Sequence, residues 1–169
     1  MSEEDREGTR DASDRKPTRS SDSPIVGRVN DSIRQLDGVL ETALYVSDLA
    51  CARAFYVDIF GCELLLDTPR LVALSVAGRS VLLLFQRGAT DAPLATPGGI
   101  VPGHGGSGVQ HLAFAIAAGT ADEWAERLAA AGVSVESRVR WRRGGESLYV
   151  RDPDGHSIEL ATPGLWAIY

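Results

Sequence analysis

Hydrophobic and polar positions along the chain predict one series of elements that occurs twice. Each series opens with an apolar strand, continues with a helix that ends at a glycine, and closes with three further strands. The first series comprises a strand over residues 39–46, a helix from its N-cap Asp48 to Gly61, and strands over residues 62–67, 70–77 and 79–86. The second comprises a strand over residues 108–116, a helix from Thr120 to Gly132, and strands over residues 133–141, 146–151 and 157–162. Two copies of a β-α-β-β-β order indicate an internally duplicated domain.

Glu159 is a carboxylate within the apolar end of the last strand, between Ile158 and Leu160. The pleat sends this side chain either to solvent or into an enclosed face, where an unpaired charge is costly and a bound cation offsets the cost. A plain solvent-facing glutamate is an equally good account of this residue on its own. A metal site therefore requires further ligands.

Superposition of the two copies supplies these ligands. His111 takes the position of Glu41, and Glu159 takes the position of Leu83. Equivalent positions face the same concave sheet surface, so we expect Glu41, His111 and Glu159 to gather there, with an apolar side chain at the fourth corner. One imidazole and two carboxylates are typical of a divalent-metal site that keeps open positions for water or substrate.

Four motifs occur within residues 39–162. They are YVSDL at 45–49, AFY at 54–56 followed by FG at 60–61, QHLAF at 110–114, and DPDG at 152–155 before IEL at 158–160. Together they resemble those of the vicinal oxygen chelate superfamily, the glyoxalase, bleomycin-resistance and extradiol-dioxygenase group. The resemblance implies an α+β fold in which paired βαβββ modules form a cupped eight-stranded mixed sheet. It also implies a metal in the cup held by Glu41, His111 and Glu159, and a homodimer.

The departures from this resemblance bear on the reaction. Glyoxalase I has a carboxylate at the fourth corner, where this chain has Leu83. Extradiol dioxygenases have a tyrosine at the position of Tyr149 but also a histidine upstream, where this chain has the arginines and tryptophan of residues 140–143. Glu41 in place of a histidine favours Mn²⁺ or Fe²⁺ and leaves Zn²⁺ and Ni²⁺ open. The sequence thus leaves a glyoxalase-like lyase or isomerase and a dioxygenase-like oxidoreductase both open.

Two functions of different class fit these observations. The first is a metal-dependent enzyme that acts on a small oxygenated substrate chelated through neighbouring oxygens, with Tyr149 as a donor to an oxyanion and Arg143 as a group that holds an anion. Tyr149 as an ordinary strand aromatic and Arg143 as a solvated turn residue are the alternative accounts. The second function is metal-free binding of a drug or other small molecule, as in bleomycin-resistance proteins, and the three metal-ligating residues weigh against it.

Composition sets the limits of this picture. The 169 residues are 44% hydrophobic, which suffices for one core, and we expect one domain over residues 31–169, with modules at 39–86 and 109–162 and a Gly/Pro-rich connection. Residues 1–30 are polar and predict a disordered tail. The net charge of −6 argues against nucleic acid. Without a signal-peptide core or a membrane-length apolar stretch, we expect a cytoplasmic protein. His104 in the connection and His156 in a turn are expected to be solvated.

Overall fold

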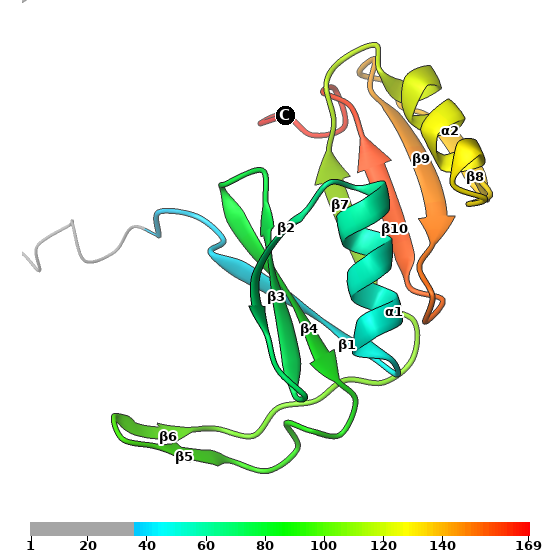
Figure 1. Cartoon of the computed structure of the whole chain (residues 1–169). Coiled ribbons are helices and arrows are strands. Elements are labelled where there is room, and N and C mark those ends of the chain that lie inside the picture. The colour runs from blue at the N-terminus through cyan, green and yellow to red at the C-terminus, as the bar shows by residue number, and fades with distance from the viewer. Residues whose placement is uncertain (1–35) are drawn as a thin grey trace, which may run out of the picture. The chain divides into compact units, whose positions relative to one another are not determined.

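Two four-stranded sheets, each accompanied by a helix, make up the α+β fold (Figure 1). The computed structural model describes residues 36–169, in which Gly38–Tyr169 form one unit, and the tail predicted over residues 1–30 lies outside the described part. The first sheet has the order β1-β4-β3-β2, with β1 (Glu41–Val46), β2 (Glu63–Asp67), β3 (Leu71–Val76) and β4 (Ser80–Gln86). The second has the order β7-β10-β9-β8, with β7 (His111–Ala115), β8 (Ser137–Arg140), β9 (Glu146–Arg151) and β10 (Ser157–Ala161).

Local signals account for the start of α1 and for the ends of both helices. The Asp48 carboxylate accepts a hydrogen bond from the backbone N–H of Cys51 at 2.9 Å and caps α1 (Leu49–Ala54), which continues as the π-helical segment η2 (Phe55–Ile59). Gly61 follows with φ of 71°, and Gly132 follows α2 (Ala121–Ala130) with φ of 73°. Both glycines adopt the left-handed conformation that ends a helix, as the sequence predicts.

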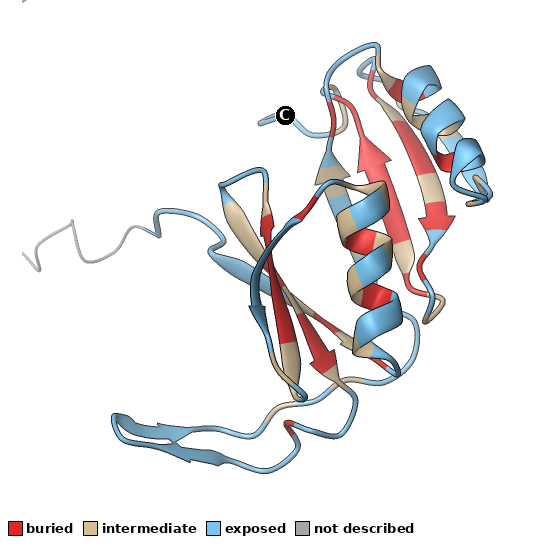
Figure 2. Cartoon of the chain, viewed as in Figure 1, coloured by how far each residue is buried: buried red, intermediate tan, exposed pale blue. Residues whose placement is uncertain are grey.

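The core lies on the face of each sheet that meets the helices, and Figure 2 shows buried residues concentrated on the inner strands β3, β4, β9 and β10. Alternate side chains of these strands enter the core, so the intervening ones face the opposite side. The helix-free faces therefore remain available for a site. The core residues from the sheets and helices include Leu44, Val46, Tyr56, Leu82, Leu84, Leu128, Leu148, Val150, Ile158 and Leu160.

His156 joins the two sheets, and the expectation that it is solvated is wrong. Its side chain is fully buried, with Nδ1 accepting from the Gln110 backbone N–H at 3.0 Å and Nε2 lying 3.1 Å from the Tyr45 carbonyl. The Gln110 side-chain oxygen accepts in turn from the Tyr45 N–H at 3.0 Å. The turn that carries His156 reaches the junction of β1 and β7, a long-range contact that local sequence does not reveal.

The connection between the modules contains a hairpin that the sequence does not predict, β5 (Leu94–Thr96) with β6 (Gly99–Val101). In Figure 1 it extends away from both sheets. Its base is closed by Thr90 and His104, because the His104 N–H donates to the Thr90 carbonyl at 2.8 Å and the Thr90 hydroxyl donates to the His104 carbonyl at 2.7 Å. The His104 ring also meets the Tyr45 hydroxyl at 2.8 Å, so this histidine is half-buried and bonded instead of a solvated linker residue.

Within residues 36–169, no strand of the first four-stranded sheet pairs with a strand of the second. The continuous eight-stranded cup that the resemblance implies therefore stays a prediction. Among residues 36–169, no helix is both long and apolar enough to span a membrane.

Candidate metal centre

His111 and Glu159 lie side by side on the helix-free face of the second sheet. Their strands β7 and β10 are parallel neighbours, and the register pairs His111 with Ser157 and Ala113 with Glu159. The distance from His111 Nε2 to Glu159 Oε2 is 3.3 Å. Glu159 is only 4% exposed, whereas the His111 side chain is 53% exposed. A buried carboxylate beside an accessible imidazole provides two adjacent donors of the kinds that divalent transition metals bind.

Two further residues hold Glu159 that sequence reasoning did not identify. The Ser147 hydroxyl donates to Glu159 Oε1 at 2.5 Å, and the Trp141 indole N–H donates to the Ser147 oxygen at 2.7 Å. The signal available in the sequence is the alternation of β9, which places Ser147 on the same face as Tyr149.

Tyr149 lies directly opposite Glu159 in the β9–β10 register. Its ring centroid is 6.3 Å from that of His111. Burial, followed by the negative charge of Glu159, raises the pKa of the Tyr149 hydroxyl. The hydroxyl is therefore protonated at neutral pH and able to donate a hydrogen bond. The structure thus brings together three of the predicted residues: His111, Tyr149 and Glu159.

Glu41 belongs to the other sheet and does not reach this cluster. The C-terminal end of β1 meets the start of β7, where the Tyr45 N–H bonds to Gln110, the residue before His111. Glu41 lies four residues before Tyr45, a distance of about 13 Å along an extended strand. In the part of the chain that the structure describes, no group of three or more His, Cys, Asp or Glu side chains is arranged to hold a metal. Within one chain, two of the three predicted ligands are therefore adjacent and the third, Glu41, is not.

The register places Leu83 and Glu159 at equivalent positions in the two sheets. Leu83 pairs with Ala43, two residues after Glu41, as Glu159 pairs with Ala113, two residues after His111. The fourth corner of the superposed modules is thus apolar.

Arg143 lies in the exposed turn between β8 and β9. Its side chain makes no hydrogen bond or ion pair with another residue of the described range 36–169. Its role toward an anionic substrate stays a prediction.

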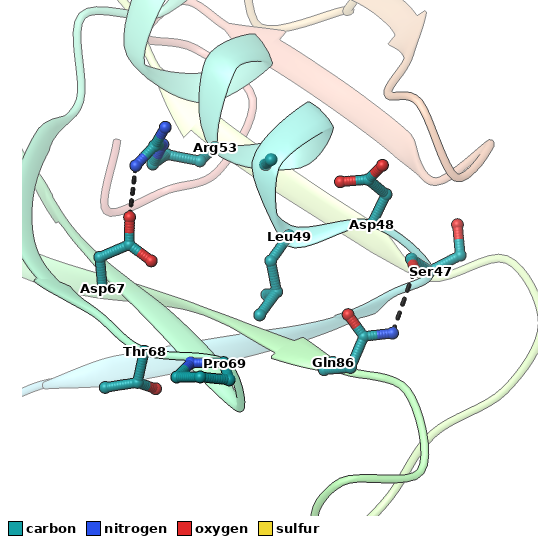
Figure 3. A pocket seen from close by; sticks show the side chains of 9 residues that line it. Ser47, Asp48, Leu49, Arg53, Asp67, Thr68, Pro69 and Gln86 are labelled. Atoms are coloured by element: carbon teal, nitrogen blue, oxygen red, sulfur yellow. Dashed lines mark hydrogen bonds and ion pairs between the residues drawn. The ribbon is translucent and has the colours of Figure 1, made fainter.

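A separate hollow of about 620 Å³ lies between α1 and the first sheet (Figure 3). Its polar groups are largely engaged already, because Asp67 pairs with Arg53, Asp48 caps α1 and Gln86 donates to the Ser47 carbonyl at 3.0 Å. None of the predicted site residues lines it. Its lining consists of Ser47, Asp48, Leu49, Ala50, Arg53, Asp67, Thr68, Pro69 and Gln86.

Comparisons with known proteins add to this geometry. A model of the Glyoxalase/Bleomycin resistance protein/Dioxygenase superfamily matches residues 38–160. The metallothiol transferase FosB of Staphylococcus saprophyticus is 30% identical over 118 residues, which cover 69% of this chain and 71% of the relative. The crystal structure of lactoylglutathione lyase from Agrobacterium tumefaciens has 39% sequence identity and a TM-score of 0.72, and the match covers 78% of this chain and 98% of that one. The fosfomycin resistance protein FosX of Listeria monocytogenes shares the fold, with 24% identity, a TM-score of 0.57, and coverage of 78% and 97% of the two chains.

Proposed function

Because the chain belongs to the Glyoxalase/Bleomycin resistance protein/Dioxygenase superfamily, we propose that it is a divalent-metal-dependent enzyme that acts on a small oxygenated substrate. The observation that carries the proposal is the 3.3 Å approach of His111 Nε2 to Glu159 Oε2. At this distance an imidazole and a carboxylate form an ordinary ion pair or hydrogen bond, and the same nitrogen and oxygen are donors that can share a divalent cation.

Glu41 is the third ligand in this proposal, supplied by a second copy of the chain. Within one chain, His111 lies near the C-terminal end of β1, whereas Glu41 lies at the N-terminal end of that strand. The three ligands therefore come together only in a homodimer. The exposure of both side chains leaves them free to meet a partner. The resulting set of one nitrogen and two carboxylates suits Mn²⁺, Fe²⁺, Zn²⁺ or Ni²⁺.

A divalent ion held by Glu41, His111 and Glu159 would supply Lewis-acid stabilisation of negative charge that develops on a substrate oxygen. Tyr149 is protonated and donates a hydrogen bond to the same oxygen or its neighbour. Arg143, in the adjoining turn, holds an anionic part of the substrate.

The names of the relatives favour one reaction class. One relative is named a metallothiol transferase and the other a lactoylglutathione lyase, and the latter shares 39% identity with this chain. The upstream histidine of the extradiol signature is replaced by residues 140–143. We therefore favour lyase- or transferase-type chemistry over insertion of oxygen, and the metal-free binding function is not favoured. A cytoplasmic location stays a prediction from composition.

Calorimetry with Mn²⁺ tests the metal site. Wild-type protein should bind about one ion per chain, and His111→Ala should abolish binding because the set has no other imidazole. His104→Ala is the matched control, since it removes a half-buried histidine that bonds to Tyr45 and not to Glu159. Equal Mn²⁺ affinity of the wild type and His111→Ala would overturn the proposal.

A further inference from the structure

We infer that Ser147 and Trp141 are positioning residues for Glu159, which fix one carboxylate oxygen so that the other alone is presented beside His111. The inference rests on the proposed function, because it assigns these two residues a role in the same metal site.

The direction of the hydrogen bonds is set by the chemistry of the donors. An indole N–H can only donate, so the Ser147 oxygen accepts from Trp141. The single Ser147 proton is then directed at Glu159 Oε1, 2.5 Å away. A hydrogen bond to an ionised carboxylate is among the stronger ones, and this one is fully enclosed, because Ser147 has no exposed surface. The orientation of the Glu159 carboxylate is therefore set before any metal arrives.

The first sheet shows that the fold itself does not require this hydroxyl. Ser147 pairs with Ala161, two residues after Glu159, and the equivalent pair in the first sheet is Leu71 with Phe85, two residues after Leu83. The same two positions are thus Ser147 and Glu159 in one module and Leu71 and Leu83 in the other. The hydroxyl occurs where the carboxylate occurs, which indicates that it serves the carboxylate.

The consequence is a carboxylate that presents one oxygen. With Oε1 held by Ser147, Oε2 is the atom 3.3 Å from His111 Nε2. A carboxylate that binds through a single oxygen leaves more coordination positions for a substrate with two neighbouring oxygens. Ser147 and Trp141 therefore determine how many coordination positions of the metal remain open to a chelating substrate.

Binding of Mn²⁺ by calorimetry and the visible absorption spectrum of the Co²⁺-loaded protein test this role. Ser147→Ala should weaken Mn²⁺ binding by about 10–100-fold, the usual effect of losing an outer-shell partner, and should change the Co²⁺ spectrum. Trp141→Phe keeps an aromatic ring but removes the N–H. It should change the Mn²⁺ affinity and the Co²⁺ spectrum in the same direction as Ser147→Ala, but to a smaller extent. Ser147→Thr keeps the hydroxyl and should restore wild-type behaviour.

Matched controls separate this role from a general loss of structure. Ser75→Ala removes a buried hydroxyl from the first sheet, and Trp124→Phe alters a tryptophan that stacks on Phe60. Both should leave the metal affinity and the Co²⁺ spectrum unchanged. If Ser147→Ala does not fold, Trp141→Phe carries the test alone.

Wild-type affinity and spectrum in Ser147→Ala or, failing that, in Trp141→Phe would overturn the positioning role while the metal site stands. Failure of the wild type to bind Mn²⁺ or Co²⁺ would instead overturn the proposed function, and this inference with it.

Discussion

The Tyr56 hydroxyl donates a hydrogen bond of 2.8 Å to Asp152 Oδ2 and so connects the helical segment of the first module to a turn of the second. Both residues are buried. The other oxygen of Asp152 accepts from the backbone N–H groups of Asp154 at 3.0 Å and His156 at 2.8 Å. Asp152 therefore shapes the turn that delivers His156 to the junction of the sheets, and Tyr56 stabilises that turn from the opposite module.

Tyr56→Phe should lower the free energy of unfolding by about 1.5–3 kcal/mol, the range for a hydrogen bond to a charged group. The ring stays in the core, so the change isolates the hydroxyl. Denaturant titration measures the difference. Tyr149→Phe is the control, because that residue is only half-buried and does not touch Asp152, and it should cost less. A change in Tyr56→Phe within about 0.5 kcal/mol of zero, as at ordinary surface positions, would show that the bond does not stabilise the domain.

The Tyr56 hydroxyl should also make the free energy of unfolding depend on pH in the alkaline range. Burial, followed by the charge of Asp152, raises the pKa of Tyr56. An unfolded tyrosine ionises near pH 10, so above about that pH the unfolded state holds fewer protons than the native state. The contribution of Tyr56 is complete below that pH and should fall by about 1.4 kcal/mol per pH unit above it.

The measurement is the difference in unfolding free energy between the wild type and Tyr56→Phe from about pH 8 to pH 11, a range that spans the ordinary tyrosine pKa. Subtraction removes the effects of Tyr149 and Tyr169, whose pKa values are also raised and which both proteins contain. A difference that does not change with pH would mean that Tyr56 ionises equally easily in both states.

Mixing two defective chains tests the shared metal site. Glu41→Ala and His111→Ala should each fail to bind Mn²⁺ tightly as homodimers, because every site lacks one donor. When the two are unfolded and refolded together, each heterodimer should contain one intact site, assembled from Glu41 of one chain and His111 of the other. Calorimetry should then detect recovered binding in the mixture. No recovery, despite mass-spectrometric proof of heterodimers, would mean that Glu41 does not act across chains.

Leu83→Glu places a carboxylate at the position equivalent to Glu159. In the proposed dimer this carboxylate lies near the metal and should tighten Mn²⁺ binding. Leu83→Gln, which has the same shape without the charge, should not. Denaturant titrations with and without Mn²⁺ measure the effect. A loss of several kcal/mol in Leu83→Glu that no divalent ion restores would show an unpaired charge buried in an apolar face, and would contradict the position assigned to Leu83.

Residues with local signals could be placed from the sequence. Asp48, Gly61 and Gly132 act on neighbouring backbone groups, so their effects on the helices follow from position alone. Superposition of the two modules likewise matched Glu159 with Leu83, and the strand registers place the two residues at equivalent positions. Residues whose partners are distant in sequence could not be placed, because nothing local indicates that His156 meets Tyr45, 111 residues away.

The predicted donor set shows the same limit. His111 and Glu159 lie on adjacent strands of one module, and their proximity follows from the order of elements within that module. The position of Glu41 relative to His111 depends on how two modules pair. The alternation of β1 does not reveal whether its partner module belongs to the same chain or to another. The hairpin β5–β6 went unpredicted because each of its strands has only three residues, among many glycines and prolines.

In the proposed assembly, the separation of Glu41 from His111 within one chain makes metal occupancy depend on the association of two chains, and therefore on protein concentration. A site that two chains share exists only while they are associated, so the metal stabilises the dimer and the dimer stabilises the metal to the same extent. Dilution should release the ion, and a limiting supply of the ion should favour dissociation. Under the proposed assembly, the activity per chain would rise with the concentration of the protein itself, and the abundance of the chain would become a determinant of its metal affinity.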